Sequence, residues 1–321
     1  MAKLSQSSDS LLIRSMKIED VVEAQAVGVA AWSDLASREL GCKVKYPARP
    51  RRIIEAYLWK EPEGCLVAEQ RGKIVGAAYS HVWGEVGWFG PFEVMPEMQD
   101  KGVGTALLLG CETFLERRGC RVQGLETMSN NAKNIHFYMR GGYRLIGSSL
   151  IMEKGLRSEV EQVPRLEPAS ALEVASCLDS ISNLSRRGHP LLNYAKELEM
   201  ASRYDLGATF LLWKRSKLKG VAVLHCFYPP EEADHASLRL LLADPRSKDQ
   251  ENAFDLLLAS CEAWAFQHGR RRLFVRFPAD NSRLYDDFLH HGYKLDAANL
   301  RLARGNRFSE RGRYHFASWA G

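Results

Sequence analysis

The sequence predicts an α/β (α+β) protein built from two tandem copies of one domain. Three observations support this prediction. The chain has 321 residues, a length that suits two domains of ordinary size. Segments with strand-like and helix-like apolar patterns follow one another in the same order in both halves. The chain also matches itself at one offset of 150 residues, and similarity at a fixed offset is typical of repeated units.

The two copies match most clearly near their ends. FYMRGGYRL (Phe137–Leu145) aligns with DFLHHGYKL (Asp287–Leu295) at this offset. Three single residues recur at the same offset along the chain, in the pairs Asn131 and Asn281, Gly119 and Gly269, and Cys111 and Cys261. Near the starts of the copies, Met16 aligns with another large apolar residue, Leu166. Prolines interrupt the chain near the junction of the copies. We therefore expect one domain at residues 1–157 and a second at 158–321, called the first and second copies below.

The first part of each copy predicts a strand, a helix and a hairpin. Residues 11–16 (LLIRSM) predict a strand, and 18–36 place apolar residues three or four positions apart, which predicts an amphipathic helix. A polar segment with prolines, residues 42–60, contains a short helix. Residues 64–83 predict a hairpin that turns at Arg71–Gly72.

The second part of each copy predicts alternating strands and helices. Residues 87–95 (GWFGPFEVM) form a further strand, and 105–117 predict a helix with its apolar residues on one side. Residues 121–128 are a strand and 134–140 a short helix. Residues 143–154 (YRLIGSSLIMEK) supply the closing strands.

Composition and charge argue against several classes of protein. The net charge of +5 is modest for this length and gives little support for a nucleic-acid-binding protein. No stretch reaches the ~18 uninterrupted apolar residues of a membrane span, and the first ten residues lack the apolar core of a secretory signal. The seven cysteines are scattered and lack a CxxC pair, which favours reduced thiols. We expect a cytoplasmic protein with no metal, no membrane and no nucleic-acid partner.

The most informative segment is a glycine-bearing loop between a strand and a helix. Pro96 ends the strand, and the run from Gln99 to Gly104 leads directly into the next helix. Its two glycines let successive backbone N–H groups point into one concavity at the positive end of the helix. Such a loop suits a pyrophosphate, and Lys101 can add a positive charge.

This segment resembles motif A of the GNAT superfamily of N-acetyltransferases, whose pattern is V-x-P-x-x-(Q/R)-x-x-G-x-(G/A). Its fixed positions are all met, by Val94, Pro96, Gln99, Gly102 and Gly104. The family's next signature is also present, at Asn131, Tyr138 and Gly142–Tyr143. The resemblance covers residues 11–154. It implies two tandem GNAT-like domains, each a mixed, mostly antiparallel twisted sheet flanked by helices.

The resemblance also implies roles for individual residues and acetyl-CoA as the co-substrate. Tyr138 would be the general acid that protonates the leaving thiolate. The residues expected to bind the cofactor are Val94 and Met95 beside the pantetheine arm, Gln99, Asp100, Lys101, Gly102, Val103, Gly104 and Thr105 around the pyrophosphate, and Asn131 nearby.

The predicted reaction is transfer of an acetyl group to a primary amine of a small molecule or peptide by direct attack. A base must remove a proton from the amine, and the sequence does not rank the candidates His81, Glu85, Glu93 and Glu126. In this fold, the segment 31–57 would face the acceptor. We therefore expect Trp32 and Tyr46, with Glu93, to contact the substrate, and the arginines at 49–52 favour an acidic acceptor.

Three alternatives remain open from the sequence. The donor could carry another acyl group, or the acceptor could be a hydroxyl. The protein could be a non-catalytic acetyl-CoA sensor or regulatory module. A nucleic-acid binder using the arginine-rich C-terminus has the least support. A homodimer is possible.

The second copy has lost the residues that carry the chemistry. At the offset of 150, Gln99, Gly102, Gly104 and Tyr138 fall on Asp249, Asn252, Phe254 and Phe288. A phenyl ring replaces a glycine, acidic residues replace a phosphate-binding loop, and the phenol acid is gone. We expect a degenerate second domain that does not bind coenzyme A in the usual way.

Overall fold

The computed structural model describes residues 10–157, 165–226, 228, 233–306, 308–310 and 312–318. The chain divides into two compact units. Unit 1 comprises Met1–Val82 and Trp88–Cys120, and unit 2 comprises Trp83–Gly87 and Arg121–Ala320. These units do not coincide with the two sequence copies, because the end of the first copy packs within unit 2.

Unit 1 is a small sheet with helices against it. Its elements are β1 (Leu12–Ser15), η1 (Ile18–Asp20), α1 (Val21–Leu40), α2 (Arg51–Lys60), β2 (Cys65–Gln70), β3 (Lys73–Trp83), β4 (Val86–Val94), η2 (Pro96–Met98) and α3 (Val103–Arg117). The strand order is β1-β2-β3-β4. The β2–β3 hairpin turns at Arg71 and Gly72, whose φ angles of +53° and +71° match the turn that suits the strand twist.

Small residues let α3 lie close to this sheet. A Cβ on Gly76 of β3 would come within 2.8 Å of Leu107 and 3.3 Å of Val103, and a Cβ on Gly110 of α3 would come within 2.8 Å of Leu66. Side chains at these two positions would push helix and sheet apart. The close packing fixes the first turn of α3 beside the end of β4.

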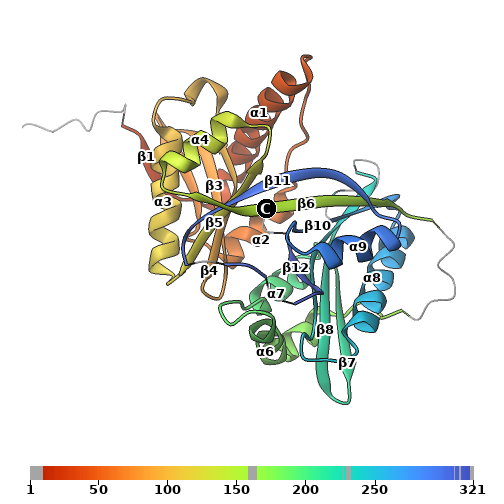
Figure 1. The fold of residues 1–321 in the computed structure, drawn as a ribbon. Coiled ribbons are helices and arrows are strands. Elements are labelled where there is room, and N and C mark those ends of the chain that lie inside the picture. The colour runs from red at the N-terminus through yellow and green to blue at the C-terminus, as the bar shows by residue number, and fades with distance from the viewer. Residues whose placement is uncertain are drawn as a thin grey trace, which may run out of the picture. The chain divides into compact units, whose positions relative to one another are not determined.

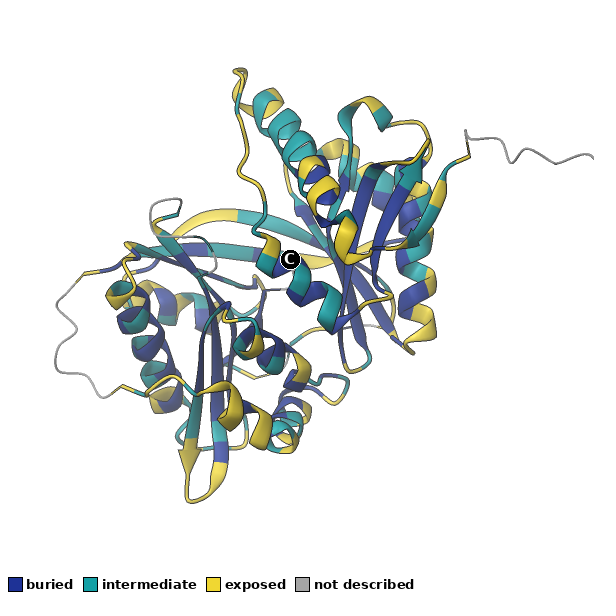
Figure 2. Ribbon diagram, turned by 180° about the vertical axis from the view of Figure 1, so that it is seen from behind, coloured by how far each residue is buried: buried dark blue, intermediate teal, exposed yellow. Residues whose placement is uncertain are grey.

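Unit 2 contains a longer sheet. Its elements are β5 (Val122–Met128), α4 (Ala132–Arg140), β6 (Arg144–Gly155), α5 (Ala171–Ser176), α6 (Leu178–Gly188), α7 (Ala195–Arg203), β7 (Gly207–Lys214), β8 (Lys217–His225), β9 (His235–Ala243), α8 (Gln250–Gln267), β10 (Arg272–Pro278), α9 (Ser282–His290), β11 (Lys294–Gly305) and β12 (His315–Ala317). The strand order is β5-β11-β6-β10-β9-β8-β7, and β12 pairs with β9. Figure 2 shows buried residues along β8, β9 and β10, whereas the first four residues of β6 and of β11 are exposed.

The last strands of the two copies have changed places. β11, from the second copy, lies between β5 and β6 of the first copy, and β6 pairs in turn with β10 of the second copy. Figure 1 shows β6 and β11 as two long strands running side by side. Each copy therefore completes its sheet with a strand of the other.

The exchange is symmetric about one residue pair. Ser149 of β6 lies opposite Asn299 of β11, and these residues occupy the same position in the two copies. Asn299 also lies opposite Met128 of β5, and Ser149 lies opposite Pro278 of β10. Pro278 follows Met128 by the same 150 residues. Residues that are 150 positions apart in the sequence thus occupy equivalent positions in the strand pairing.

Most of the expected elements are present, and they differ from the expectation mainly at their ends: the helix expected at 18–36 is Val21–Leu40, and the helix expected at 134–140 is Ala132–Arg140. The helix expected at 105–117 begins two residues earlier, at Val103, because Gly102 supplies its N-cap with φ of +84°. The closing strands expected at 143–154 are one continuous strand, β6. The proposed junction of the copies adjoins residues 158–164, which lie outside the described residues.

The described residues contain neither a membrane-spanning helix nor a cluster of metal-binding side chains. No helix among them is long and apolar enough to cross a membrane. Within the same ranges, no group of three or more His, Cys, Asp or Glu side chains could hold a metal ion. All seven cysteines are free thiols.

Candidate functional site

The loop between β4 and α3 forms an open turn at the helix N-terminus. Asp100 and Gly102 both have positive φ, at +59° and +84°, and Gly102 caps α3. Nothing lies within 4 Å of a Cβ built on Gly102, and Lys101 is exposed. The first bond of the helix runs from Ala106 N to Gly102 O at 3.0 Å. The amides just before it therefore have no acceptor within the helix, and they adjoin open space.

The remaining loop residues join this turn to the sheet. Met95 N donates to Val75 O at 3.0 Å, so Met95 continues the pairing of β4. Gln99 Nε2 lies 3.5 Å from the carbonyl oxygen of Val94. Val103 is buried, Gly104 is half-buried and Thr105 is exposed. All the motif A residues of the expected cofactor site thus belong to one short segment of unit 1.

Tyr138 and Asn131 lie at the two ends of α4, in unit 2. The Oδ1 of Asn131 accepts a hydrogen bond from Asn134 N at 3.0 Å and so caps α4. Tyr138 is 7% exposed, and its ring packs edge-on against Phe137 and Tyr143. Tyr138 thus belongs to unit 2, whereas the motif A loop belongs to unit 1.

A buried carboxylate lies among the acceptor residues of unit 1. One oxygen of Glu93, Oε1, accepts hydrogen bonds from Trp32 Nε1 at 2.8 Å and from Arg49 Nη1 at 3.0 Å. The Glu93 side chain is 1% exposed. Its other oxygen, Oε2, is buried without a hydrogen-bond partner. A buried carboxylate oxygen without a partner is costly and is a natural place for a ligand to donate.

Residues of the α1–α2 segment are fixed around Glu93. Trp32 stacks on Tyr46 with ring centroids 5.6 Å apart, and Arg49 lies over the Tyr79 ring at 5.5 Å. A Cβ on Gly28 of α1 would lie 3.0 Å from Glu93 Oε2. A glycine at this point of α1 therefore leaves room for the carboxylate. The structure brings together the three expected substrate residues, Trp32, Tyr46 and Glu93.

The other three candidate bases have partners elsewhere. His81 Nε2 lies 2.8 Å from Gly90 O, and its ring packs against Tyr57. Glu85 is half-buried and pairs with Arg121 of the same unit, which lowers the pKa of Glu85.

Glu126 belongs to a buried ion cluster of unit 2. Its carboxylate contacts Arg276 at 2.8 Å and Arg301 at 3.0 Å, and accepts a hydrogen bond from Ser149 at 2.7 Å. Burial alone would raise the pKa of Glu126, but the two guanidinium groups and the Ser149 hydroxyl outweigh burial and lower it. A carboxylate held in this way is a poor proton acceptor at neutral pH.

Two of the arginines at 49–52, which favoured an acidic acceptor, have carboxylate partners within the protein. Arg49 points inward to Glu93 and is 17% exposed, while Arg51 pairs with Glu55 one helical turn away. Arg301, from the arginine-rich C-terminus, is buried between Glu126 and Glu310. Arg307 and Arg311 lie outside the described residues. The pairing of Arg49 with Glu93, 44 residues apart, has no sequence signal that would reveal it.

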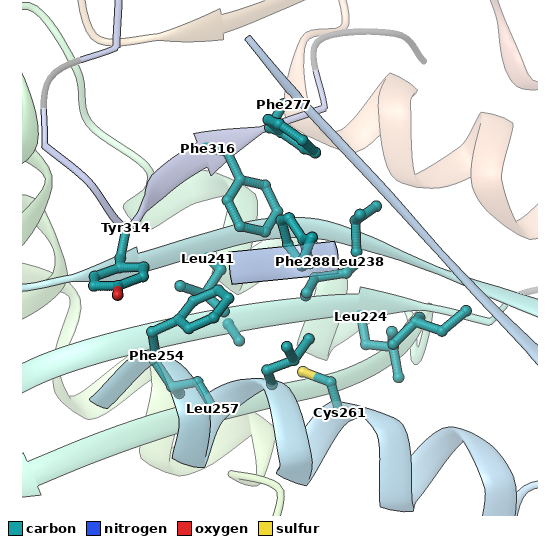
Figure 3. Packing of buried hydrophobic residues seen from close by; sticks show 14 of the residues in the cluster. Leu224, Leu238, Leu241, Phe254, Leu257, Cys261, Phe277, Phe288, Tyr314 and Phe316 are labelled. Atoms are coloured by element: carbon teal, nitrogen blue, oxygen red, sulfur yellow. The ribbon is translucent and has the colours of Figure 1, made fainter. Parts of the chain in front are cut away.

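The corresponding region of the second copy is filled by aromatic side chains. Phe254 replaces Gly104 and is fully buried, and its ring stacks on Tyr314 with centroids 4.5 Å apart. Phe288 replaces Tyr138 and packs against Phe254 at 5.6 Å and Phe316 at 5.6 Å. Figure 3 shows these rings meeting in one cluster. Asp249, at the start of α8, is paired with Lys214.

The C-terminal segment supplies part of this filling. β9 and β10 pair in parallel only over His235–Leu238 and Arg272–Val275. Farther along β9, β12 pairs with Leu240–Leu242 in antiparallel register. Asn281, the counterpart of Asn131, donates from Nδ2 to Arg313 O at 3.0 Å. The segment from Arg313 to Ala317 thus touches the second-copy counterparts of the expected cofactor residues.

Two sequence comparisons identify relatives of the first copy. The sequence model described as "Acetyltransferase (GNAT) family" matches residues 30–143. An acetyltransferase of Sodalis glossinidius (strain morsitans), SG1711, is 30% identical over 112 residues, which are 35% of this chain and 79% of that protein.

Solved structures extend the likeness to the whole chain. A putative acetyltransferase from Pyrococcus horikoshii has a TM-score of 0.69 at 16% identity, covering 99% of this chain and 98% of that one. A tandem GNAT protein from the clavulanic acid biosynthesis pathway has a TM-score of 0.59 at 14% identity, covering 94% and 100%. At such low identity these two structures bear on the fold alone, which they share over both halves. The two sequence matches show that this chain belongs to the GNAT family of acetyltransferases.

Proposed function

We propose that this chain is an acetyl-CoA-dependent N-acetyltransferase that acetylates a primary amine of a small molecule or peptide, using the site of its first copy. One observation carries the proposal: the GNAT family match at residues 30–143 contains both the open loop before α3 and Tyr138. The donor loop and the proposed acid therefore lie within the same family match.

The loop before α3 fits the diphosphate of coenzyme A. Its helix-terminal amides carry the positive end of the helix dipole, Lys101 is exposed beside them, and the space next to Gly102 is open. We assign Gln99 to Thr105 to the pyrophosphate, and Val94 and Met95 to the pantetheine arm. Asn131 is assigned a place beside the cofactor.

When bound, acetyl-CoA supplies an activated acyl group in a thioester. Tyr138 then acts as the general acid: its hydroxyl gives a proton to the sulfur as the carbon–sulfur bond breaks. The amine nitrogen forms the new bond to the acyl carbon and loses a proton to a base. A free thiol has a pKa near ~8.5, so protonating the leaving sulfur favours its departure.

Glu93 is the candidate that best fits a role toward the acceptor amine. Its Oε2 atom is buried and has no partner, whereas Oε1 is held by Trp32 and Arg49. An ammonium or a bridging water can donate to Oε2, and either arrangement passes a proton toward the carboxylate. Because Arg49 is already paired with Glu93, we do not extend the acidic-acceptor expectation to Arg49.

We assign the chemistry to the first copy alone. In the second copy, Phe254 and Phe288 fill the positions of Gly104 and Tyr138, and β12 lies along β9. A side chain at the position of Gly104 and a strand on that edge leave no room for a pantetheine arm. The second copy is therefore proposed to be degenerate toward coenzyme A.

The test is turnover of acetyl-CoA against a panel of amines and alcohols, followed by release of free thiol. We expect thiol release that depends on a primary amine. Tight binding of acetyl-CoA with no turnover by any acceptor would favour a sensor instead. Turnover only with longer acyl-CoA, or only with alcohols, would correct the donor or the acceptor, and the absence of any binding would refute the proposal.

A further inference from the structure

Unit 2 contains a pocket that the proposed acetyl transfer does not use. It has a volume of about 310 Å³ and lies on β9 and β10, with residues of β6, β11 and the C-terminal segment around it. We call it the β9–β10 pocket.

The strand pattern explains why this pocket is polar. On β9, Ser237 and Arg239 alternate with residues of the apolar core, and on β10, Arg272, Phe274 and Arg276 do the same. Successive side chains of a strand point to opposite faces, so these residues share the face away from the core. Three guanidinium groups therefore gather on one patch of two adjacent strands.

The guanidinium groups are held in place by neighbours. Arg239 Nη1 donates to the hydroxyl of Ser318 at 3.1 Å, and Arg276 Nη1 contacts Glu126 at 2.8 Å. Arg272 pairs with Asp234 at 2.9 Å and with Glu153 at 3.2 Å. A guanidinium has five N–H donors. These contacts fix the orientation of each group, and Nε of Arg239 is a buried donor with no hydrogen-bond partner among the described residues.

Acidic groups around the pocket limit its positive charge. Among the lining residues, Asp296 carries a carboxylate, and it is exposed. The carboxylates that pair with Arg272 and Arg276 also reduce the field of those arginines. His235, at the pocket, has its pKa lowered by burial and by the charge of Arg272, so it is neutral at pH 7. We therefore expect recognition by directed hydrogen bonds, not by a strong general field.

The remaining wall of the pocket is apolar. Ile151 and Phe274 line it beside the arginines and the Ser237 and Ser318 hydroxyls, whereas Leu238 and Val275, which also adjoin the pocket, belong to the core on the opposite face of the strands. A lining of this kind, apolar with a few convergent donors, is typical of small-molecule sites.

We propose that the β9–β10 pocket binds a small molecule that carries a carboxylate or phosphate oxyanion on an apolar body. The guanidinium and hydroxyl donors bind the oxyanion, because planar N–H pairs suit carboxylate and phosphate oxygens. The Phe274 side of the pocket holds the apolar body.

The ligand is bound and not acetylated at this pocket. Ser318, which contributes its hydroxyl to the pocket, directly follows β12, and its N–H donates to Arg239 O at 2.7 Å. Tyr314 and Phe316, from the same segment, are buried in the aromatic cluster of Figure 3. The chain itself thus occupies the edge of β9 beside the pocket, where β12 pairs with Leu240–Leu242. The pocket therefore binds its ligand without transferring an acyl group to it, since Phe288 replaces the proposed general acid in the second copy.

The experiment uses the full chain at pH 7 without acetyl-CoA and measures binding by calorimetry. The probes are benzoate, phenyl phosphate and benzyl alcohol, which share a ring and differ in charge. We expect at least one of the two anions to bind at least tenfold more tightly than benzyl alcohol, because the neutral probe cannot form charge-assisted hydrogen bonds. If benzoate binds more tightly, the pocket prefers a carboxylate. If phenyl phosphate binds more tightly, it prefers a phosphate.

Two variants locate the binding. Arg239→Gln should weaken binding of the tighter anion at least tenfold, and Ser237→Ala should weaken it less. Arg186→Gln, an exposed arginine whose partner is Asn183, is the matched control and should change nothing. If Arg239→Gln fails to fold, as judged by its thermal transition, the Ser237→Ala result decides.

Three results would overturn the proposal: no saturable binding of either anion, equal binding of benzyl alcohol, or full retention of anion binding by both pocket variants. None of these depends on acetyl transfer, so failure here leaves the proposed function of the first copy standing.

Discussion

Glu126 Oε2 lies 2.8 Å from Nη1 of Arg276, and these two residues occupy the same position in the two copies, 150 residues apart. The ion pair thus joins corresponding points of β5 and β10. The registers of β5 with β11 and of β10 with β6 repeat the same symmetry. A single domain that exchanged its last strand with an identical partner would have this arrangement, and the tandem chain contains both partners in one polypeptide.

Replacing Glu126 by Gln should lower the free energy of unfolding of unit 2 by about 3–5 kcal/mol. The Glu126 side chain is fully buried and faces Arg276 and Arg301, and removing one member of a buried ion cluster leaves charge uncompensated. Urea unfolding measures the change. Glu153→Gln is the matched control, because Glu153 pairs with Arg272 at a partly exposed site and should cost under about 1 kcal/mol.

The pH dependence of the same variant provides an independent check. The pKa of Glu126 is lowered from 4.5 by its partners, so its contribution is complete above pH 4.5 and is lost as the pH falls through the folded-state pKa. The difference between wild type and Glu126→Gln should therefore be constant above about pH 5.5 and shrink below pH 4.5. A difference that stays constant down to pH 3 would contradict the assigned ion cluster.

The strand exchange shows where prediction from the sequence stops. The turn at Arg71–Gly72, the glycine loop and α4 all depend on local patterns, and the structure has each of them. The pairing partners of β6 and β11, in contrast, do not depend on local sequence patterns. Residues 143–154 and 294–305 have similar patterns, so either strand can complete either sheet, and only packing between the copies decides. The contact of Arg49 with Glu93 is hidden for the same reason, since it is set by tertiary structure.

A chain ended at residue 157 should not behave as a stable monomer. Removing β11 leaves the paired edges of β5 and β6 open, and open strand edges associate with other chains. We expect light scattering to report dimers or larger species, with a lower thermal transition than the full chain. Co-expression with residues 165–321 is the control, and the two fragments should purify together because each supplies the other's last strand. A monomeric, fully active 1–157 fragment would show that the exchange is dispensable.

Glu93→Gln should lower kcat/KM for the amine about 10- to 100-fold while the affinity for acetyl-CoA stays within about twofold. The buried Oε2 has no protein partner, so the loss falls on the acceptor side, and the scale is that of one hydrogen bond to a charged group. Trp32→Phe is the control, because it removes one donor to Oε1 and keeps the carboxylate. An equal loss in acetyl-CoA affinity would place Glu93 in the cofactor site instead.

Tyr138→Phe should reduce the rate of acetyl transfer about 10²- to 10⁴-fold, the usual contribution of a positioned general acid. The phenyl ring keeps the packing of Tyr138 against Phe137 and Tyr143, so cofactor affinity and thermal stability should stay close to wild type. Single-turnover thiol release measures the rate, and calorimetry measures the affinity. Phe137→Leu, on the same helix turn, controls for packing. Turnover at the wild-type rate would remove Tyr138 from the acid role.

Gly104→Phe should abolish binding of acetyl-CoA. The substitution gives the first copy the phenylalanine that the second copy has at the corresponding position, Phe254. The change puts a phenyl ring into the first turn of α3, where the amides are proposed to meet the pyrophosphate. By calorimetry we expect the wild type to bind one acetyl-CoA per chain and Gly104→Phe to bind none. Phe254→Leu, which keeps the second-copy position buried and apolar, should still bind one. If Gly104→Phe retained one bound acetyl-CoA, the donor would occupy the second copy despite the β12 strand and the aromatic cluster, and the assignment of the two copies would be reversed.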